Sequence, residues 1–515
     1  MAEMQSLNGP IYEPTPLPAP LGGIVLDRPV DQLEDHQLAS ASNMLVRDGI
    51  VQQRQGYTAA VGTGAISPIG DHPYQLCEWV PFDGSARLVL GGFSFFGRYD
   101  ATNATPQWVS ITATARTGTI SNPIFFTPMR TASSGLRLIS VNGVDPPAWW
   151  SGDTSSTFVY MTTAVIGRCA DVWRSHYVQG DVTVATADGH VGARIQWSAI
   201  GDPTVWSGTA SVGTLDLLDS NASRVQLFMP MRGTELVYKE EGVHALAYKG
   251  SPFYFVQTLV HAHLTCISRR AVAPVFNGDQ HVVVTKENII MWDGQNIDRI
   301  GDPIRKYFFD NLNWDQRELV WAIYSPLTEE VFIGAPTGSD TVPTVIWIFN
   351  LRHGSWWYMP TRNMLHFYVP TKTFNPPQLL ATDRGADKVW KMLLGATDDG
   401  TAISSSMQWK LFDFGRPGYN KSIRRVTTVV DPGTGSTTTV NISRAIAEQP
   451  LESLSFDTGN TLTSTNARKE LVADQRVTAK YMSFRLTHTA SGETVRIRGL
   501  VPWIDQGPKE RKTRE

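Results

Sequence analysis

Cysteine is scarce in this chain, with three in 515 residues: Cys77, Cys169 and Cys266. They are odd in number and far apart, so they build neither a disulfide framework nor a CxxC zinc knuckle, which fits synthesis in a reducing cytoplasm. Charged residues are also few, at 18%. No apolar run reaches the roughly 18 residues of a transmembrane helix. The N-terminus lacks the basic start and apolar core of a signal peptide. We therefore expect no membrane segment.

Residues that favour short strands and tight turns are abundant, with 16 Trp, 43 Gly and 31 Pro. The length exceeds what one hydrophobic core usually serves, so two or more domains are expected. Charge is unevenly spread: residues 401–515 hold 17 Lys and Arg against 11 Asp and Glu, whereas the preceding residues hold 28 against 37. The asymmetry predicts a basic face in the C-terminal part, although a modest excess is usually a solvated surface.

The clearest pattern lies in the stretch Glu318–Pro360. It divides into four short segments, each alternating or continuously apolar and bounded by Gly, Pro, Asn or Ser: Val320–Tyr324, Glu330–Ile333, Val345–Asn350 and Trp356–Met359. Such segments are typical of antiparallel strands. Four strands in about forty residues is the size of one propeller blade.

Loosely similar units recur along most of the chain, at 74–111, 123–161, 170–216, 223–259, 272–307, 318–360 and 364–394. Their spacing of about 35 to 50 residues suits blades and excludes ankyrin or leucine-rich repeats. We therefore predict an all-β protein with a β-propeller-like body of about six or seven four-stranded blades over residues 74–395.

The flanking regions have other patterns. Residues 1–23 are Pro-rich and predict an extended arm or a clamp on a neighbouring subunit. Residues 24–73 predict a lead-in, with a helix from Asp31 to Val46 followed by a hairpin turn at Asp48-Gly49. A polar linker is expected at 396–406, a β-sandwich over the long alternating strands of 407–505, and a charged disordered tail at 506–515.

Two Gly-Asp-Pro sequences, at 201–203 and 301–303, predict short helical turns inside the blades, because proline suits the first helical position. The second is followed by a one-sided apolar stretch and is the more convincing helix.

Metal binding was considered for His261, His263 and Cys266. On a strand the two histidines share a face, but Cys266 has the opposite parity and no fourth ligand is near in sequence, so a satisfied pair of strand histidines is the preferred interpretation. The sequence predicts no metal site and no cofactor, since no glycine-rich nucleotide motif follows a strand.

Catalysis was considered for the acid pairs Glu329-Glu330 and Glu240-Glu241 and for the sialidase-like sequence Thr397–Thr401. Adjacent acids at a turn point to opposite sides, whereas glycoside hydrolysis needs two carboxyl groups converging on a cleft. Thr397–Thr401 lacks the tryptophan of the sialidase motif. We expect no catalytic residues and no enzyme activity. The aromatic clusters 356–358 and 93–99 are interpreted as packing rather than as stacking platforms.

Basic residues of the C-terminal part are the remaining candidates for binding. Arg496 and Arg498 share a strand face, and Arg485 is placed on a neighbouring strand, so these three are predicted to face a partner subunit or a lumen. The alternative is that they are solvated strand residues paired with nearby acids.

Five stretches together resemble the nozzle or tail-hub proteins of short-tailed double-stranded DNA phages, including packaged-DNA stabilisation proteins. They are Ser42–Gly49 with Arg54-x-Gly56-Tyr57, Arg194–Trp206, Gly301–Asn311, Tyr324–Pro336 and Trp347–Tyr358. The likeness covers roughly residues 25–400. It implies a propeller that assembles as a six-fold ring below the portal and adaptor, closes the DNA channel after packaging and conducts DNA on ejection.

The resemblance further implies a location in the virion tail after synthesis in the host cytoplasm. The expected partners are further copies of the chain as a homohexamer, the portal-adaptor tail protein, other tail proteins or fibres, and packaged double-stranded DNA. Two alternatives stay open. One is a carbohydrate-binding or carbohydrate-degrading propeller, and the other is a receptor-binding adhesin without catalysis.

Overall fold

The computed structural model describes residues 12–505, except 60–71, 103–106, 134, 162–164, 185–188, 219–221, 361–362, 433–436 and 451. The chain forms two compact units. The propeller unit comprises Thr58–Ile348 and Thr361–Met392, and the terminal unit comprises Met1–Tyr57, Phe349–Pro360 and Leu393–Glu515. The predicted charged tail, 506–515, lies outside the described residues.

Successive four-stranded antiparallel sheets form the first blades of the propeller, numbered here in chain order. Blade 1 is β6 (Pro73–Trp79), β7 (Arg87–Gly92), β8 (Phe96–Asp100) and β9 (Gln107–Ser110). Blade 2 is β10 (Phe125–Thr131), β11 (Gly135–Val141), β12 (Ala148–Trp150) and β13 (Val159–Tyr160). Blade 3 is β14 (Val165–Trp173), β15 (His176–Val184), β16 (His190–Trp197) and β17 (Gly213–Asp216). Blade 4 is β18 (Val225–Met231), β19 (Thr234–Lys239), β20 (Glu241–Gly250) and β21 (Tyr254–Thr265).

Three more sheets complete the series. Blade 5 is β22 (Val272–Val275), β23 (Gln280–Val284), β24 (Ile289–Trp292) and β25 (Ile297–Asp298). Blade 6 is β26 (Trp321–Ser325), β27 (Glu330–Ala335), β28 (Val345–Asn350) and β29 (Ser355–Pro360). The last sheet has the order β30-β31-β32-β5-β33-β34, with β30 (Met364–Tyr368), β31 (Leu380–Asp383), β32 (Lys388–Met392), β5 (Tyr57–Ala59), β33 (Thr397–Asp398) and β34 (Thr401–Ala402).

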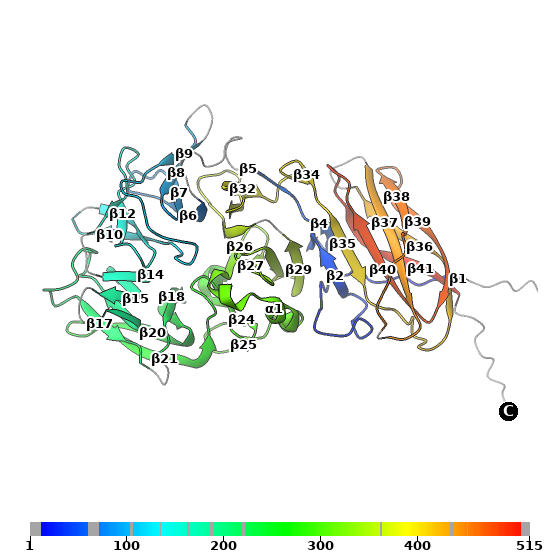
Figure 1. The fold of residues 1–515 in the computed structure, drawn as a ribbon, viewed down its shortest axis with the longest axis horizontal. Coiled ribbons are helices and arrows are strands. Elements are labelled where there is room, and N and C mark those ends of the chain that lie inside the picture. Colours follow the sequence, from blue (N-terminus) through cyan, green and yellow to red (C-terminus); the bar gives the residue numbers. More distant parts are fainter. Residues whose placement is uncertain are drawn as a thin grey trace, which may run out of the picture. The chain divides into compact units, whose positions relative to one another are not determined.

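The seven predicted segments correspond one to one with these seven sheets, so the β-propeller is confirmed. Figure 1 shows the sheets of the propeller unit around a common centre, with β6, β14, β18 and β26 inside and β9, β17 and β21 outside. The ring is closed between blades 7 and 1. The Glu78 backbone N–H donates to Tyr368 Oη at 2.8 Å, and Thr382 Oγ1 donates to the Tyr74 carbonyl at 3.1 Å.

The burial of the blade strands agrees with the apolar patterns from which the blades were predicted. Strands β27 and β28 are buried along their whole length, as the continuous apolar run around Val345 predicts. Outer positions carry more exposed residues, and the aromatic side chains fill the spaces between sheets. Trp79, Phe96, Trp150 and Phe158 form one such cluster between blades 1 and 2. Large rings contribute most of the buried apolar area in such contacts.

The terminal unit contains two antiparallel sheets. The first has the order β3-β4-β41-β36-β39, with β1 on β41: β1 (Tyr12–Pro14), β3 (Met44–Arg47), β4 (Ile50–Gln53), β36 (Lys421–Asp431), β39 (Glu470–Ala479) and β41 (Arg496–Asp505). The second has the order β2-β35-β40-β37-β38: β2 (Leu38–Ser42), β35 (Ser405–Trp409), β37 (Thr437–Ala447), β38 (Asn460–Thr465) and β40 (Tyr481–His488). That these two sheets pack face to face as a sandwich remains a prediction.

The lead-in differs from its prediction. No helix lies between Asp31 and Val46 among the described residues; strands β2 and β3 occupy the second half of that segment. Pairing with β35 and β4 buries Leu38, Met44 and Leu45, so tertiary pairing overrides the helical interpretation. The Asp48-Gly49 hairpin turn is confirmed, because both residues have positive φ, 53° and 72°, between paired β3 and β4.

The other boundaries also shift. The sequence predicted a separate domain at 407–505, but residues 12–57 contribute strands to the same two sheets. The predicted linker 396–406 contains β33, β34 and the start of β35. The described part of the Pro-rich arm is in contact with the rest of its own chain: β1 pairs with β41, and the Leu17 N–H donates to the Leu500 carbonyl at 2.9 Å.

Helical structure is short in the described residues. The helix α1 spans Arg305–Asn311, two residues later than the position predicted for Pro303, and two 3₁₀ turns span Phe276–Gly278 and Trp314–Leu319. At Gly201-Asp202-Pro203 there is a turn without helix, in which Asp202 Oδ1 accepts from the Thr204 N–H at 2.9 Å. No helix among the described residues is long and apolar enough to cross a membrane.

Candidate functional site

The predicted basic face is only partly assembled. Arg496 and Arg498 flank buried Ile497 on β41, and both are exposed on one face, as the alternation predicts. The prediction that Arg485 lies on a strand next to that of Arg496 and Arg498 is wrong, because its strand β40 belongs to the other sheet of the terminal unit. Its Nη2 donates to Gln408 Oε1 at 3.0 Å, and its guanidinium lies 3.8 Å from the ring centre of Phe456. Burial lowers the pKa of Arg485.

The histidine and cysteine candidates do not converge. His261 and His263 lie on the outer strand β21, whereas Cys266 is buried and its Sγ donates to the Ser268 carbonyl at 3.1 Å. Burial raises the pKa of the Cys266 thiol, which disfavours the thiolate that a metal needs. Among the described residues, no group of three or more His, Cys, Asp or Glu side chains is placed to hold a metal ion.

The acid and aromatic candidates have structural surroundings. Glu329 is exposed at the β26–β27 turn and Glu330 is buried, so the two carboxyl groups point apart as expected. Trp356 and Trp357 are both fully buried, in agreement with the packing interpretation. Asp398 of the sialidase-like sequence is engaged in an ion pair with Arg54.

That ion pair belongs to a network around the sequence Arg54-x-Gly56-Tyr57. Arg54 donates through Nη1 and Nη2 to the two carboxylate oxygens of Asp398 at 2.8 and 2.6 Å. Its Nε donates to Asn43 Oδ1 at 2.7 Å, and Asn43 Nδ2 donates to the Ser404 carbonyl at 2.7 Å. Gly56 is required beside them, because a Cβ there would lie 1.8 Å from the Thr397 carbonyl oxygen. These residues hold the segment that contains β3 and β4 to strand β33 and to Ser404.

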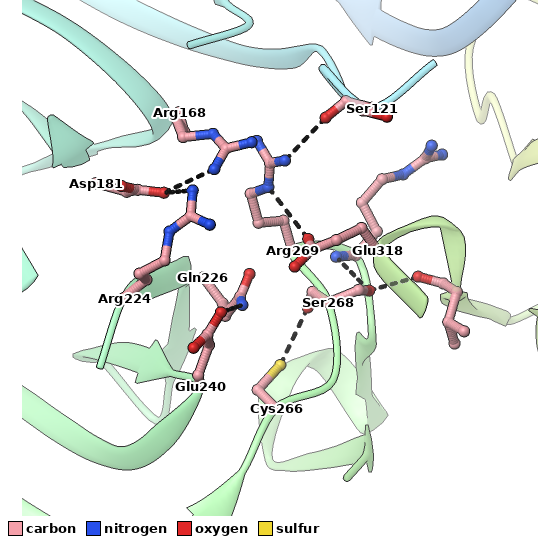
Figure 2. Close-up of polar contacts among 12 residues, drawn as sticks. Ser121, Arg168, Asp181, Arg224, Gln226, Glu240, Cys266, Ser268, Arg269 and Glu318 are labelled. Carbon is pink, nitrogen blue, oxygen red and sulfur yellow. Dashed lines mark hydrogen bonds and ion pairs between the residues drawn. The ribbon is translucent and has the colours of Figure 1, made fainter. Parts of the chain in front are cut away.

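A second polar cluster, which sequence reasoning missed, lies at the inner strands of the propeller (Figure 2). We call it the inner arginine cluster: Arg168 on β14, Arg224 just before β18 and Arg269 just before β22, with Asp181 on β15 and Glu318 before β26.

Asp181 pairs with two of these arginines. Its Oδ2 lies 3.4 Å from Arg168 Nη1 and 3.0 Å from Arg224 Nη2, and its Oδ1 lies 2.6 Å from His190 Nε2. The carboxylate is 2% exposed. Burial raises the pKa of Asp181, although Arg168 and His190 act in the opposite direction. Close cations such as these stabilise the charged form of a buried carboxylate.

Arg269 is the most deeply buried of the three arginines, at 2% exposed. Its Nη2 donates to the Ser121 carbonyl at 3.0 Å, and its Nε lies 3.6 Å from Glu318 Oε2. Its Nη1 has no hydrogen-bond partner among the described residues. Burial lowers the pKa of Arg269, and the neighbouring charge of Arg168 lowers it further.

The backbone around Arg269 is fixed to the next blade. Ser268 Oγ donates to the Val320 carbonyl at 2.5 Å and accepts from the Arg270 N–H at 3.2 Å. Nearby, Gln226 Nε2 donates to Glu240 Oε1 at 3.3 Å, and burial, followed by the charge of Glu318, raises the pKa of Glu240. The sequence signal for this cluster was weak: the Arg269-Arg270 pair marks it, but its partners lie on three other blades.

A third feature is the outer strand of blade 4, which we call the β21 edge. Strand β21 is the last strand of its sheet, and β20 is the strand it pairs with among the described residues. It is twelve residues long, and Val256, Leu259 and Val260 on it are exposed, as are Tyr248 and Phe253 beside it. The exposed fraction of Phe253 reaches 73%. Exposed strand edges that carry apolar side chains are able to pair with or pack against another chain.

No known protein family and no curated protein match the sequence. Among solved structures, the chain is similar to the Neurospora crassa Pan2 WD40 domain, with 10% identity and a TM-score of 0.37, over 67% of this chain and 97% of that one. It is also similar to BBS1N from its complex with ARL6DN, with 12% identity and a TM-score of 0.39, over 66% and 97%. A third is the β-propeller domain of Myceliophteria thermophila Cps50 (Swd1), with 11% identity and a TM-score of 0.37, over 62% and 96%.

Proposed function

We propose that this chain is a structural protein of a phage tail, without enzyme activity of its own. It forms the nozzle or hub ring below the portal and adaptor, closes the DNA channel after packaging and conducts DNA on ejection. Its partners are further copies of itself, as a homohexamer, the portal-adaptor protein, other tail proteins or fibres, and the packaged double-stranded DNA. The proposal places the protein in the virion tail.

The observation that carries the proposal is the β21 edge. It combines a free strand edge with exposed Val256, Leu259 and Val260, and covering such a surface stabilises an assembly by burying apolar area. In a ring, each subunit contacts the next through two different surfaces, so the β21 edge packs against another face of the neighbouring copy. The phage assignment rests on the sequence resemblance, in which Asn43 and Arg54 take part; in the structure these two residues are hydrogen-bonded within the terminal unit.

Imaging of whole virions tests the assignment directly. Cryo-electron microscopy of particles that carry this chain is expected to show several copies in a ring below the portal. Absence of the chain from the virion, or its presence as a single copy, would contradict the proposal. Virions are required because assembly on the preceding tail component does not have to occur with the isolated chain.

A paired substitution tests the contact surface. Leu259→Lys with Val260→Lys places two charges on the β21 edge and is expected to reduce filled, infectious particles at least tenfold in a complementation assay. The matched control is Val159→Lys, on the outer strand β13 of blade 2, where the side chain is 53% exposed. Equal particle yields from both variants would show that the β21 edge is plain surface.

A further inference from the structure

The inner arginine cluster carries more positive charge than its acids balance. Three guanidinium groups, those of Arg168, Arg224 and Arg269, stand against the carboxylates of Asp181 and Glu318. Figure 2 shows the side chains of Arg168 and Arg269 next to each other, and the charge of Arg168 disfavours the charged form of Arg269. Like charges this deep in a protein repel strongly unless an anion lies between them.

Donor atoms in the cluster are also left over. Arg269 Nη1 and Arg224 Nε are buried and have no hydrogen-bond partner among the described residues. Each guanidinium has five N–H donors, and leaving one of them buried and unused costs free energy. The arginine orientations are nonetheless fixed, because the Ser121 carbonyl and Asp181 each hold one guanidinium at 3.0 Å.

The three arginines differ in their contact with solvent. The side chain of Arg224 is 38% exposed and that of Arg168 is 21% exposed, whereas that of Arg269 is 2% exposed. An anion from solution would meet Arg224 and Arg168 before Arg269. Asp181 does not occupy that position, because its two oxygens are taken by Arg168, Arg224 and His190.

We propose that the inner arginine cluster is a binding site for one small oxyanion, held jointly by Arg168, Arg224 and Arg269. Guanidinium groups recognise phosphate and carboxylate through paired, charge-assisted hydrogen bonds, which use the donors that are free here. The bound oxyanion would neutralise the surplus charge and join blades 3, 4 and 5 at the centre of the propeller. The site does not depend on the proposed tail function.

Thermal unfolding of the purified full chain tests the site. The chain is titrated with inorganic phosphate and, separately, with acetate, each against sodium chloride at matched ionic strength. A saturable rise in Tm with phosphate or with acetate is expected, and the stronger of the two identifies the ligand as a phosphate or a carboxylate. No saturable rise beyond that in chloride with either anion would overturn the proposal.

Variants separate binding from a general salt effect. Arg224→Gln is expected to weaken the apparent affinity at least tenfold, because Arg224 is partly exposed and contributes a free Nε. Arg496→Gln, an exposed arginine of the terminal unit, is the control and should leave the titration unchanged. An unchanged titration in Arg224→Gln would contradict the site. Arg269→Gln should abolish the effect, but the test rests on Arg224, where a folding defect is less expected.

Discussion

Arg54 in the terminal unit and Arg269 in the propeller are buried to the same extent, at 3% and 2% exposed, but they have different partners. Arg54 makes a two-pronged ion pair with Asp398 at 2.8 and 2.6 Å and uses its Nε on Asn43. Arg269 reaches Glu318 only at 3.6 Å, and its Nη1 is unused among the described residues. A buried arginine whose donors are all used by a close carboxylate and amide stabilises one structure. A buried arginine with an unused donor is able to bind an anion as well.

The largest expected effect on stability comes from breaking the Arg54–Asp398 ion pair of the terminal unit. Asp398→Ala leaves Arg54 buried without its counter-charge and is expected to lower the free energy of unfolding by about 3–5 kcal/mol. Urea denaturation measures the loss, and hydrogen exchange in peptides covering β3 and β4 assigns it to the terminal unit. The control is Asp474→Ala, which removes a pair with Arg476 in which both side chains are more than half exposed. It should cost within about 0.5 kcal/mol. A comparable loss in both variants would show that the buried pair is not special.

A buried acid of the propeller extends the comparison. Glu235 on β19 is 1% exposed, and its Oε1 has no partner among the described residues. Burial, followed by the charge of Asp171, raises the pKa of Glu235 to about 9. Because the folded-state pKa is raised, this group stabilises the fold at low pH. That contribution is lost as the pH rises from the ordinary glutamate pKa of 4.5 in the unfolded chain toward about 9.

Glu235→Gln should therefore remove this pH dependence. Between pH 5 and pH 8, the wild type is expected to lose about 2–4 kcal/mol more of its unfolding free energy than the variant. Denaturation at a series of pH values measures the difference. Glu329→Gln, at the exposed β26–β27 turn, should keep the wild-type dependence. Parallel pH curves for wild type and Glu235→Gln would mean that the carboxyl is ionised in the fold.

A direct contrast between the two arginines gives a smaller effect. Arg269→Met, measured in chloride, is expected to cost only about 1 kcal/mol, because it removes the 3.6 Å ion pair with Glu318 and, at the same time, the repulsion from Arg168. Arg54→Met should cost about 3 kcal/mol or more, because Asp398 and Asn43 lose their partner together. Equal costs in urea denaturation would remove the distinction between the clusters.

The two units also differ in how far the sequence predicts them. Blades 1 to 6 pair strands that are neighbours in the chain, so alternation and turn residues were enough to place them, and the last sheet was placed by β30 to β32 although it also takes in the distant β5. The sheets of the terminal unit pair β2 with β35 and β4 with β41, strands hundreds of residues apart, and no local pattern encodes such pairs. The helix predicted from Asp31 failed for the same reason. The inner arginine cluster was missed because a ring brings together positions that have no fixed spacing in the chain.

The double variant Arg496→Glu and Arg498→Glu is expected to have the smallest effect on stability. It is also the sharpest test of the terminal unit. Both side chains are exposed on one face of β41, so the double variant should change the unfolding free energy by no more than about 0.5 kcal/mol. If this face contacts a partner subunit or DNA phosphates, reversing two charges turns attraction into repulsion. Circular dichroism checks the fold, and a count of filled, infectious particles after complementation checks the contact. We expect an intact fold with a clear fall in yield. Wild-type yield would mean that the two arginines are simply solvated. Arg485 would not replace them in such a contact, because it belongs to the other sheet and its guanidinium already contacts Gln408 and Phe456.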